Sequence, residues 1–435
     1  MFQRLRWIRQ NGIMNVVFHG AEHSRFSHAM GVAHVAGMMF DAIVANTPDA
    51  CPRPGFERDR EDTILAGLLH DIGHGPFSHT LEEILGKEKF DHERMTVRIL
   101  SEESEIHQLL KGTDDELPDR LIPFIDKKRR TSPTWYHSIV SSQLDADRLD
   151  YLMRDATMAG VWSHRFDLQR LIRSLGVHEN EIVVDERASD IIESYLLALD
   201  QMYRIAYYHK TNRAATFLLR AIINRVSDCL REAPGEVSRF FPQPSSAPFL
   251  ALLQQGHEIP LDLYQRIDES DVWSLIGSWR DAGDPVLDEL VPWLRSRHLP
   301  KVIVAPDVPL KTLQGIEEDL VQQFMEEFPE KDPRYYITVD LPKRKSYTAG
   351  TYEEGFANSI KVLGLDNKLV AIEKRERSIA KLIESIQYYP ALIVPPEFRD
   401  AARAQLKGTP AVPRTQWTTG RPSKDTIREK RGRHE

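Results

Sequence analysis

Three histidines and one carboxylate lie close together in residues 66–79, which read Ala-Gly-Leu-Leu-His-Asp-Ile-Gly-His-Gly-Pro-Phe-Ser-His. The leucines before His70 have helical spacing, so we expect His70 and Asp71 at the end of a buried helix that Gly73 and Pro76 stop. Adjacent helical residues diverge by about 100°, which lets an imidazole nitrogen and a carboxylate oxygen approach one cation from two directions. A His-Asp pair alone is also compatible with a core histidine beside a surface acid.

Histidines are concentrated in the first part of the chain. Of the 16 histidines in the sequence, those within the first 92 residues are His19, His23, His28, His34, His70, His74, His79 and His92. Random scatter would rarely produce this density. The clustering therefore indicates a site.

The segment 144–155 carries many charges for a helix with an apolar face. Leucines and Met153 supply an apolar stripe, while four aspartates and two arginines occupy the other faces. Charged groups on a helix with a buried stripe are unusual unless they are paired or bind an ion. This segment is a second source of candidate ligands.

A site built from His28, His70, Asp71 and Asp147 would combine two imidazoles and two carboxylates from three helices. This mixture suits one divalent metal ion, Mn, Fe, Zn or Mg, with open positions for water and a phosphate oxygen. Such an ion lowers the pKa of bound water and offsets charge on a phosphoryl group. Both effects are required for the hydrolysis of a phosphoester.

His74, His79 and His92 are near the central pair in the sequence and have two interpretations. They either make hydrogen bonds at helix ends, or form a second layer that binds phosphate oxygens and protonates an alkoxide leaving group. We favour the second, because an unprotonated 5′-oxygen is a very poor leaving group. Arg25, Arg148 and Lys210 are candidate anion-binding residues, with ordinary surface charge as the alternative.

The hydrophobic patterning predicts a mainly α fold with a helical core and a smaller C-terminal α+β subdomain. We expect helices near residues 2–8, 28–45, 62–72, 81–85, 144–155, 188–229, 311–328 and 375–386, with another that begins after an Asp91 N-cap. We expect strands near residues 16–18, 175–184, 302–305, 335–339, 359–363 and 369–372. The predicted domains are 1–230 (helical, metal-dependent), 231–300 (helical connector), 301–405 (α+β) and 406–435 (basic tail).

Composition limits the possible partners. The chain has 435 residues, 41% of them hydrophobic, and a formal net charge of −8, which gives no overall reason to expect a nucleic-acid or membrane partner. We find no apolar stretch near the ~20 residues of a membrane span and no apolar N-terminal signal, so we expect a cytoplasmic protein. The basic tail is either a disordered solvated end, which we favour, or a nucleic-acid contact.

With these residues assembled, the chain resembles the HD-domain phosphohydrolases, and in particular their deoxynucleoside triphosphate triphosphohydrolase branch. The stretches that carry the resemblance are Phe2-Gln-Arg-Leu-Arg, Gly20-Ala-Glu-His-Ser-Arg-Phe-Ser-His28, residues 70–79, His92-Glu93, Asp145-Ala-Asp-Arg-Leu-Asp-Tyr151 with Arg154-Asp155, and Tyr207-Tyr-His-Lys210. They span about half of the chain in the family's order.

The resemblance implies a mainly helical HD-domain core and a role for each matching residue. It implies metal ligands at His28, His70, Asp71 and Asp147, and catalytic histidines at His74, His79 and His92. It also implies that Arg25 and Arg148 contact the phosphates, and Arg25 is a further catalytic candidate. It implies that Gln10 and Asp155 hold the sugar 3′-hydroxyl, that Tyr207 excludes a 2′-hydroxyl, and that Tyr151 and Tyr208 complete the pocket. A rigid phenol ring against C2′ would exclude ribose by overlap.

Family members form dimers or tetramers, and some are activated by nucleotides bound between subunits. The resemblance therefore implies a homo-oligomer and a possible nucleotide activator. Gln3, Arg6, Arg187 and Lys210 occupy positions where such regulatory contacts are made.

The chain departs from the family pattern at three positions. Leu199 stands where the triphosphohydrolases have an arginine that binds the far end of the triphosphate, Asn11 replaces an apolar residue against the sugar, and His19 stands where proline is common. The first departure puts recognition of a full triphosphate in doubt.

Three functions follow from these residues. The first is hydrolysis of a dNTP to deoxynucleoside and triphosphate, with water on the metal attacking the α-phosphorus. The second is a phosphatase or phosphodiesterase activity on a smaller nucleotide, which Leu199 would favour. The third is a scaffold that binds nucleotide or nucleic acid without turnover.

Overall fold

The computed structural model describes residues 1–50, 56–162, 165–342, 347, 359–384, 389–407 and 409. The described part is mostly helical and contains small sheets, which confirms the predicted fold class. The chain divides into two compact units, Met1–His298 with Ser346–Glu384 and Leu299–Lys345 with Ser385–Glu435. The predicted division at residues 230, 300 and 405 stays a prediction.

The first unit holds most of the helices. Its helices up to residue 232 are α1 (Arg25–Asn46), α2 (Phe56–Leu69), α3 (His79–Leu85), α4 (His92–Ser101), α5 (Glu105–Thr113), α6 (Leu117–Ile125), α7 (His137–Val140), α8 (Ala146–Met158), α9 (Leu168–Arg173), α10 (Ser189–Met202) and α11 (Lys210–Glu232). The later ones are α12 (Val237–Phe240), α13 (Ala247–Gln255), α14 (Leu261–Tyr264), α15 (Glu269–Trp279), α16 (Pro285–Arg295), α18 (Ile372–Arg375) and α19 (Arg377–Glu384).

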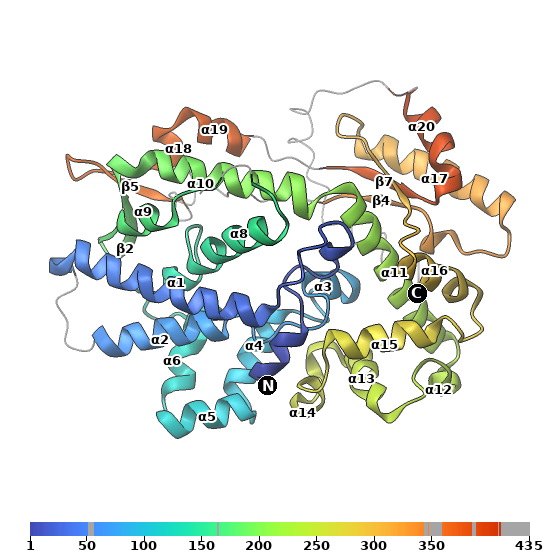
Figure 1. Ribbon diagram of the computed structural model, residues 1–435, viewed down its shortest axis with the longest axis horizontal. Coiled ribbons are helices and arrows are strands. Elements are labelled where there is room, and N and C mark those ends of the chain that lie inside the picture. Colours follow the sequence, from blue (N-terminus) through green and yellow to red (C-terminus); the bar gives the residue numbers. More distant parts are fainter. Residues whose placement is uncertain are drawn as a thin grey trace. The chain divides into compact units, whose positions relative to one another are not determined.

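Helix α1 lies in contact with both α2 and α8 (Figure 1). Ser24 begins α1, because its hydroxyl accepts a hydrogen bond from the Ser27 backbone N–H at 3.4 Å. Asp145 begins α8 in the same way, by accepting from the Arg148 N–H at 2.8 Å. The apolar side chains of α1 and α8 then pack into one hydrophobic core. The first turns of α1 and α8 lie close to the residues that follow α2, since His28 and His70 both lie near Asp147.

The loop after α2 needs glycine because it approaches α4 very closely. A Cβ atom on Gly73 would lie 2.3 Å from both the carbonyl oxygen of His92 and the backbone nitrogen of Thr96. The Thr96 hydroxyl joins the two segments by accepting from the Gly73 N–H at 3.0 Å and donating to the His70 carbonyl at 3.1 Å. Asp91 caps α4 as predicted, by accepting from the Arg94 N–H. The loop is therefore joined to α4 by a close backbone contact and by the Thr96 hydroxyl.

Several predicted elements differ from the structure. Residues 16–18 are not a strand, since Met14–Val16 form a 3₁₀ turn. Helix α2 ends at Leu69, so His70 and Asp71 lie in the following turn and not in the helix. The long helix predicted over 188–229 is two helices, α10 and α11, separated by a π-helical turn at Tyr203–Tyr207. Tertiary contacts override local sequence preference at these three points.

The strands predicted in the C-terminal part are divided between two sheets. The first sheet has the order β1-β2-β5-β6 and consists of β1 (Leu175–His178), β2 (Glu181–Asp185), β5 (Lys361–Leu363) and β6 (Leu369–Ala371). β2 and β5 are parallel, with Val184 opposite Val362, while the two outer pairs are antiparallel. The predicted strands at 359–363 and 369–372 thus extend the 175–184 hairpin.

The second unit is an α+β arrangement. Its antiparallel sheet has the order β3-β7-β4 and consists of β3 (Lys301–Val304), β4 (Thr338–Asp340) and β7 (Ala391–Val394). Helices α17 (Leu310–Glu327) and α20 (Arg399–Lys407) contact this sheet and each other. The central strand β7 is buried along its whole length, so it forms the core of this unit.

Among the described residues, α1 has the length and hydropathy of a membrane span, although no such stretch was expected. More than half of its most apolar window is buried inside the protein. Core helices of globular proteins pass the same test, so this is weak evidence for a membrane segment.

Candidate functional site

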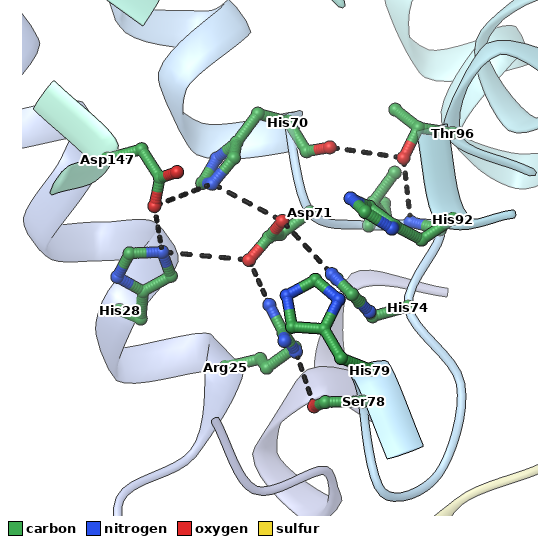
Figure 2. A network of polar contacts seen from close by, with 12 residues as sticks. Arg25, His28, His70, Asp71, His74, Ser78, His79, His92, Thr96 and Asp147 are labelled. Atoms are coloured by element: carbon green, nitrogen blue, oxygen red, sulfur yellow. Dashed lines mark hydrogen bonds and ion pairs between the residues drawn. The ribbon is translucent and has the colours of Figure 1, made fainter. Parts of the chain in front are cut away.

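Four side chains from three segments converge at the first turns of α1 and α8 (Figure 2). The Nε2 atom of His28 lies 3.1 Å from an oxygen of Asp147 and 3.6 Å from an oxygen of Asp71. The Nε2 atom of His70 lies 3.4 Å from Asp71 and 3.7 Å from Asp147. The four predicted metal ligands are therefore brought together around one point.

Both imidazoles are oriented by their other ring nitrogen. The Nδ1 atom of His70 lies 2.7 Å from the carbonyl oxygen of Gly67, to which it donates, and the Nδ1 atom of His28 lies 2.8 Å from a carboxylate oxygen of Asp150. Arg154 holds that carboxylate through two hydrogen bonds. These contacts leave each Nε2 atom with its lone pair directed at the common point, as in metal-binding histidines.

The electrostatics of this group favour a cation. Burial lowers the pKa of His28, but the carboxylates of Asp147 and Asp150 outweigh burial and raise that pKa to about 10. The pKa of Asp147 is lowered, because the neighbouring imidazoles outweigh the burial that would raise it. A proton on an imidazole is one cation that these carboxylates stabilise, and a metal ion is another.

Two ring nitrogens that are unpaired among the described residues indicate that these four side chains suit a divalent metal ion. The Nε2 atoms of His28 and His70 are buried and have no hydrogen-bond partner within the described structure. Buried polar atoms are normally satisfied, and a cation held by His28, His70, Asp71 and Asp147 would satisfy both. Two nitrogen and two oxygen donors are compatible with Mn, Fe, Zn or Mg.

Arg25 reaches the same group from the first turn of α1. Its buried guanidinium makes an ion pair with Asp71, and its Nε donates to the Ser78 hydroxyl at 2.8 Å. Ser78 in turn donates to the Arg9 carbonyl at 2.8 Å. Arg25 therefore fixes the position of Asp71 and of the loop before α3, and it adds positive charge beside the metal ligands.

The three remaining histidines of the predicted site form a second group beside Asp71 (Figure 2). His74 stacks on His92 with 3.8 Å between ring centroids, and its Nε2 atom lies 3.4 Å from Asp71. Glu82 holds the other two, with Nδ1 of His79 at 3.0 Å and Nδ1 of His92 at 2.5 Å from its oxygens. Burial would raise the pKa of Glu82, but these histidines lower it below its ordinary value. Glu82 is therefore an anion that orients two imidazoles.

Next to this group lies a cavity of about 310 Å³, and six of the seven residues predicted to bind the substrate line it. Those residues are Gln10, Arg25, Tyr151, Asp155, Tyr207 and Tyr208, together with His79 and Asn11. The Tyr207 hydroxyl donates to Asp155 at 2.6 Å, and the other Asp155 oxygen lies 2.7 Å from Nε2 of His23. Six predicted residues from distant segments thus share one cavity.

The walls of this cavity contain unsatisfied polar atoms. The Oε1 atom of Gln10, the Nδ2 atom of Asn11 and the Oδ1 atom of Asn212 are buried and have no hydrogen-bond partner within the described residues. An unpaired buried polar atom costs roughly 1–3 kcal/mol. A ligand with hydroxyl and amide-like groups would remove this cost.

Other predicted residues lie elsewhere. Arg148 lines a different cavity, of about 720 Å³. Leu199 is buried in the hydrophobic core, and His19 is exposed and lines neither cavity.

The four predicted regulatory residues line neither of these two cavities. Gln3 accepts a hydrogen bond from Arg6, whose guanidinium covers the Phe26 ring, and Arg187 pairs with Asp185 on the surface. Lys210 is exposed at the start of α11. The regulatory site therefore stays a prediction.

The sequence analysis missed three acidic residues that hold this site. Glu82 follows His79 by three residues and Asp150 follows Asp147 by three, so helical spacing could have indicated both. Glu269 accepts from the backbone N–H groups of Arg9 and Phe77. Nothing in the sequence near Glu269 indicates that contact, since it comes from a segment 192 residues from Phe77.

The chain also matches known protein families. Residues 25–155 match the model of the HD domain, and residues 166–275 match that of the HD associated region. The uncharacterized protein YwfO of Bacillus subtilis is 33% identical over 339 residues, which cover 78% of this chain and 73% of YwfO.

Human deoxynucleoside triphosphate triphosphohydrolase SAMHD1 is 31% identical over 243 residues, which cover 48% of this chain and 38% of SAMHD1. The chain therefore spans well under half the length of this relative. Among solved structures, a phosphohydrolase from Bacteroides thetaiotaomicron has a TM-score of 0.73 at 24% identity and covers 90% of this chain and 93% of its own. At that identity the likeness establishes the fold.

Proposed function

Because this chain belongs to the HD-domain phosphohydrolase family, we propose that it hydrolyses deoxynucleoside triphosphates to deoxynucleoside and triphosphate with one divalent metal ion. The observation that carries the proposal is the adjacency of the four-ligand group to a cavity whose wall contains Gln10, Asp155 and Tyr207. The four ligands would hold the metal, and the cavity would hold a deoxyribose.

The metal site supports a hydrolytic reaction. His28, His70, Asp71 and Asp147 would hold the ion, which when bound supplies Lewis-acid stabilisation of phosphoryl charge and makes water more acidic. Arg25 places a buried positive charge beside Asp71, where it would stabilise negative charge that develops on the phosphate oxygens.

The reaction requires a proton donor for the departing sugar oxygen. Attack of a water oxygen on the α-phosphorus breaks the bond from phosphorus to O5′, and that oxygen leaves as a hydroxyl only when it takes up a proton. Of the three clustered histidines, His79 lines the substrate cavity, and Glu82 orients its ring. We assign the donor role to His79, with His92 and His74 binding phosphate oxygens.

The cavity supports preference for deoxyribose. The hydrogen bond from the Tyr207 hydroxyl to Asp155 fixes the phenol ring against the cavity. A fixed ring beside C2′ leaves no space for a 2′-hydroxyl. The named activity of the human relative, deoxynucleoside triphosphate triphosphohydrolase, is consistent with this substrate class.

A second candidate is a phosphatase or phosphodiesterase that acts on a smaller nucleotide. The observation that favours it is the burial of Leu199 in the core, so that α10 supplies no cation there for a terminal phosphate. A scaffold that binds nucleotide without turnover is a third candidate, which the complete set of ligands and histidines disfavours.

For the oligomeric state, the location, the activator and the metal, our proposal rests on the family resemblance. We propose a homo-oligomer, a dimer or tetramer, located in the cytoplasm, with a nucleotide activator as a further possibility through Gln3, Arg6, Arg187 and Lys210. Mn, Fe, Zn and Mg remain candidate ions.

One experiment separates the three functions. Purified protein loaded with each of the four metals is incubated with every dNTP, NTP and dNMP, and products are resolved by anion-exchange chromatography. Triphosphate and deoxynucleoside from dNTPs support the first function, and orthophosphate alone supports the second. No turnover with any metal, substrate or added nucleotide, together with nucleotide binding, supports the scaffold.

A further inference from the structure

The largest cavity described above, of about 720 Å³, lies in the first unit and has no role in the proposed reaction. Its wall is formed by the 127–144 segment before α8, the turn between β1 and β2, and the first residues of β5. A volume of this size is typical of sites for small molecules and nucleotides.

The charges in this wall are predominantly positive. Lys127, Arg130, Arg148 and Lys361 line the cavity, against the carboxylates of Glu179 and Glu181. Glu181 is already paired with Lys361. Within the described residues, Lys127 and Arg130 form no ion pair, and Arg130 donates only to the carbonyls of Pro123 and Phe124. The wall therefore has an excess of positive charge.

An anion would stabilise these two cations. Partial desolvation and the nearby charge of Arg130 lower the pKa of Lys127, although its side chain remains exposed to solvent. Burial also lowers the pKa of Arg130. A bound anion would stabilise both charged forms.

Polar groups complete the wall. The side-chain amide of Gln143 lines the cavity, and the NH₂ group of that amide is a hydrogen-bond donor. Ser138 and Ser141 contribute hydroxyl groups to the same wall. Cations with neighbouring hydroxyl and amide groups are the usual composition of a phosphate site.

Arg148 connects this cavity to the candidate active site. It follows the metal ligand Asp147 in α8, and its guanidinium lies close to Tyr151 and Tyr203, which line the smaller cavity. Its Nε atom also lies 3.9 Å from an oxygen of Asp145. A charge bound in the larger cavity would therefore act directly on a residue beside the metal ligands.

We propose that this cavity is an oligophosphate-binding site, in which Lys127, Arg130 and Arg148 hold two or more linked phosphate groups. The linked phosphates have two possible sources. They are either the distal phosphates of a substrate whose sugar lies in the smaller cavity, which would compensate for Leu199, or a separate oligophosphate ligand.

Binding of inorganic triphosphate to the full-length protein after EDTA treatment tests the proposal by isothermal titration calorimetry. Lys127→Gln should weaken binding about tenfold, the loss expected for one charge-assisted contact. Lys128→Gln is the matched control, because Lys128 is exposed on the same turn, as Lys127 is, but does not line the cavity. The affinity of the Lys128→Gln variant for triphosphate should equal that of the wild type.

Equal triphosphate affinities for wild type and Lys127→Gln would overturn the proposal, as would equal losses in the two variants. Thermal melting of both variants shows whether each remains folded. Because the side chain of Lys127 makes no hydrogen bond or ion pair among the described residues, we expect its replacement to leave the fold intact. The titration involves no turnover, so its result stands whether or not dNTP hydrolysis is observed.

Kinetics of the metal-loaded enzyme distinguish the two sources. If the cavity holds the tail of the substrate, Lys127→Gln raises KM for dNTP and leaves KM for dNMP unchanged, and inorganic triphosphate inhibits competitively. If it holds a separate ligand, triphosphate changes the rate without competing with dNTP. Either result supports an oligophosphate site, whereas a triphosphate effect that Lys127→Gln does not change would contradict it.

Discussion

The carboxylate of Glu269 accepts a hydrogen bond from the backbone N–H of Phe77 at 3.2 Å and is itself 2% exposed. Phe77 and Ser78 both have positive φ angles, 60° and 53°, which are unfavourable for residues with a side chain. They immediately precede His79. A residue at the start of α15 thus stabilises the strained turn that positions the candidate proton donor.

We expect Glu269→Ala to reduce both stability and activity. The substitution leaves the Phe77 N–H without its buried partner and leaves Arg9 paired with Glu22 alone, which should cost roughly 1–3 kcal/mol in the free energy of unfolding. Chemical denaturation and kcat measured on the same sample would check this. Asp262→Ala removes an exposed carboxylate from the neighbouring α14 and should change neither. Full activity in Glu269→Ala would show that the turn does not depend on this contact.

Glu269 should also make stability depend on pH. Burial raises its pKa from 4.5 to about 7, more than Arg9 lowers it. The folded state therefore favours the neutral acid, so the contribution to stability is complete below pH 4.5 and is lost as pH rises through about 7. Between pH 4.5 and 8, the free energy of unfolding of the wild type should fall by about 3 kcal/mol relative to that of the non-titrating Glu269→Gln variant. A difference between the two proteins that stays constant with pH would exclude this titration.

Removal of one ligand should abolish metal binding. We expect Asp147→Ala to lose the ion and all hydrolytic activity, because two imidazoles and one carboxylate that is already paired with Arg25 would remain. Metal content by elemental analysis after gel filtration is the measurement. Unchanged metal content in this variant would remove Asp147 from the ligand set.

Asp150 should act through His28 without binding the metal itself. Its carboxylate holds Nδ1 of His28, and Asp150→Asn keeps the shape but removes the charge that makes the imidazole a stronger ligand. We expect metal affinity to fall about 10–100-fold, as for other residues that orient a metal ligand.

Competition with a fluorescent chelator measures this affinity, and Asp190→Asn, an exposed acid paired with Arg170, is the control. Gly31→Ala should give a related defect, because its Cβ would overlap the Asp150 carboxylate. Wild-type affinity in both variants would argue against an orienting role.

Tyr207 should control sugar selection by its ring. Tyr207→Phe loses the hydrogen bond to Asp155 but keeps the ring, so discrimination between dNTP and NTP should persist. Tyr207→Ala removes the ring and should raise the ratio of kcat/KM for NTP to that for dNTP by about tenfold or more. The pair of variants separates steric exclusion from the hydrogen bond. An unchanged ratio in Tyr207→Ala would show that another residue controls the selectivity.

The sequence by itself determined which residue types are available for a metal site. His70 and Asp71 are adjacent, residues 144–155 combine an apolar stripe with four aspartates, and the Asp91 cap follows from local backbone chemistry. Such features depend on residue type and short spacing, which are visible without the fold. The cavity residues Gln10, Asp155 and Tyr207 were found by family resemblance, since no local property of these residues indicates a sugar.

Only the tertiary structure decided how these groups are held. It ended α2 before His70, because the backbone of the following turn approaches α4 too closely for a helix to continue. It divided α10 from α11 at the tyrosines of the pocket, and it brought Glu269 to Phe77 across 192 residues. It also placed Lys127 and Arg148 around one cavity. Contacts between distant segments depend on packing, and the periodicity of a local sequence contains no information about which segments will meet.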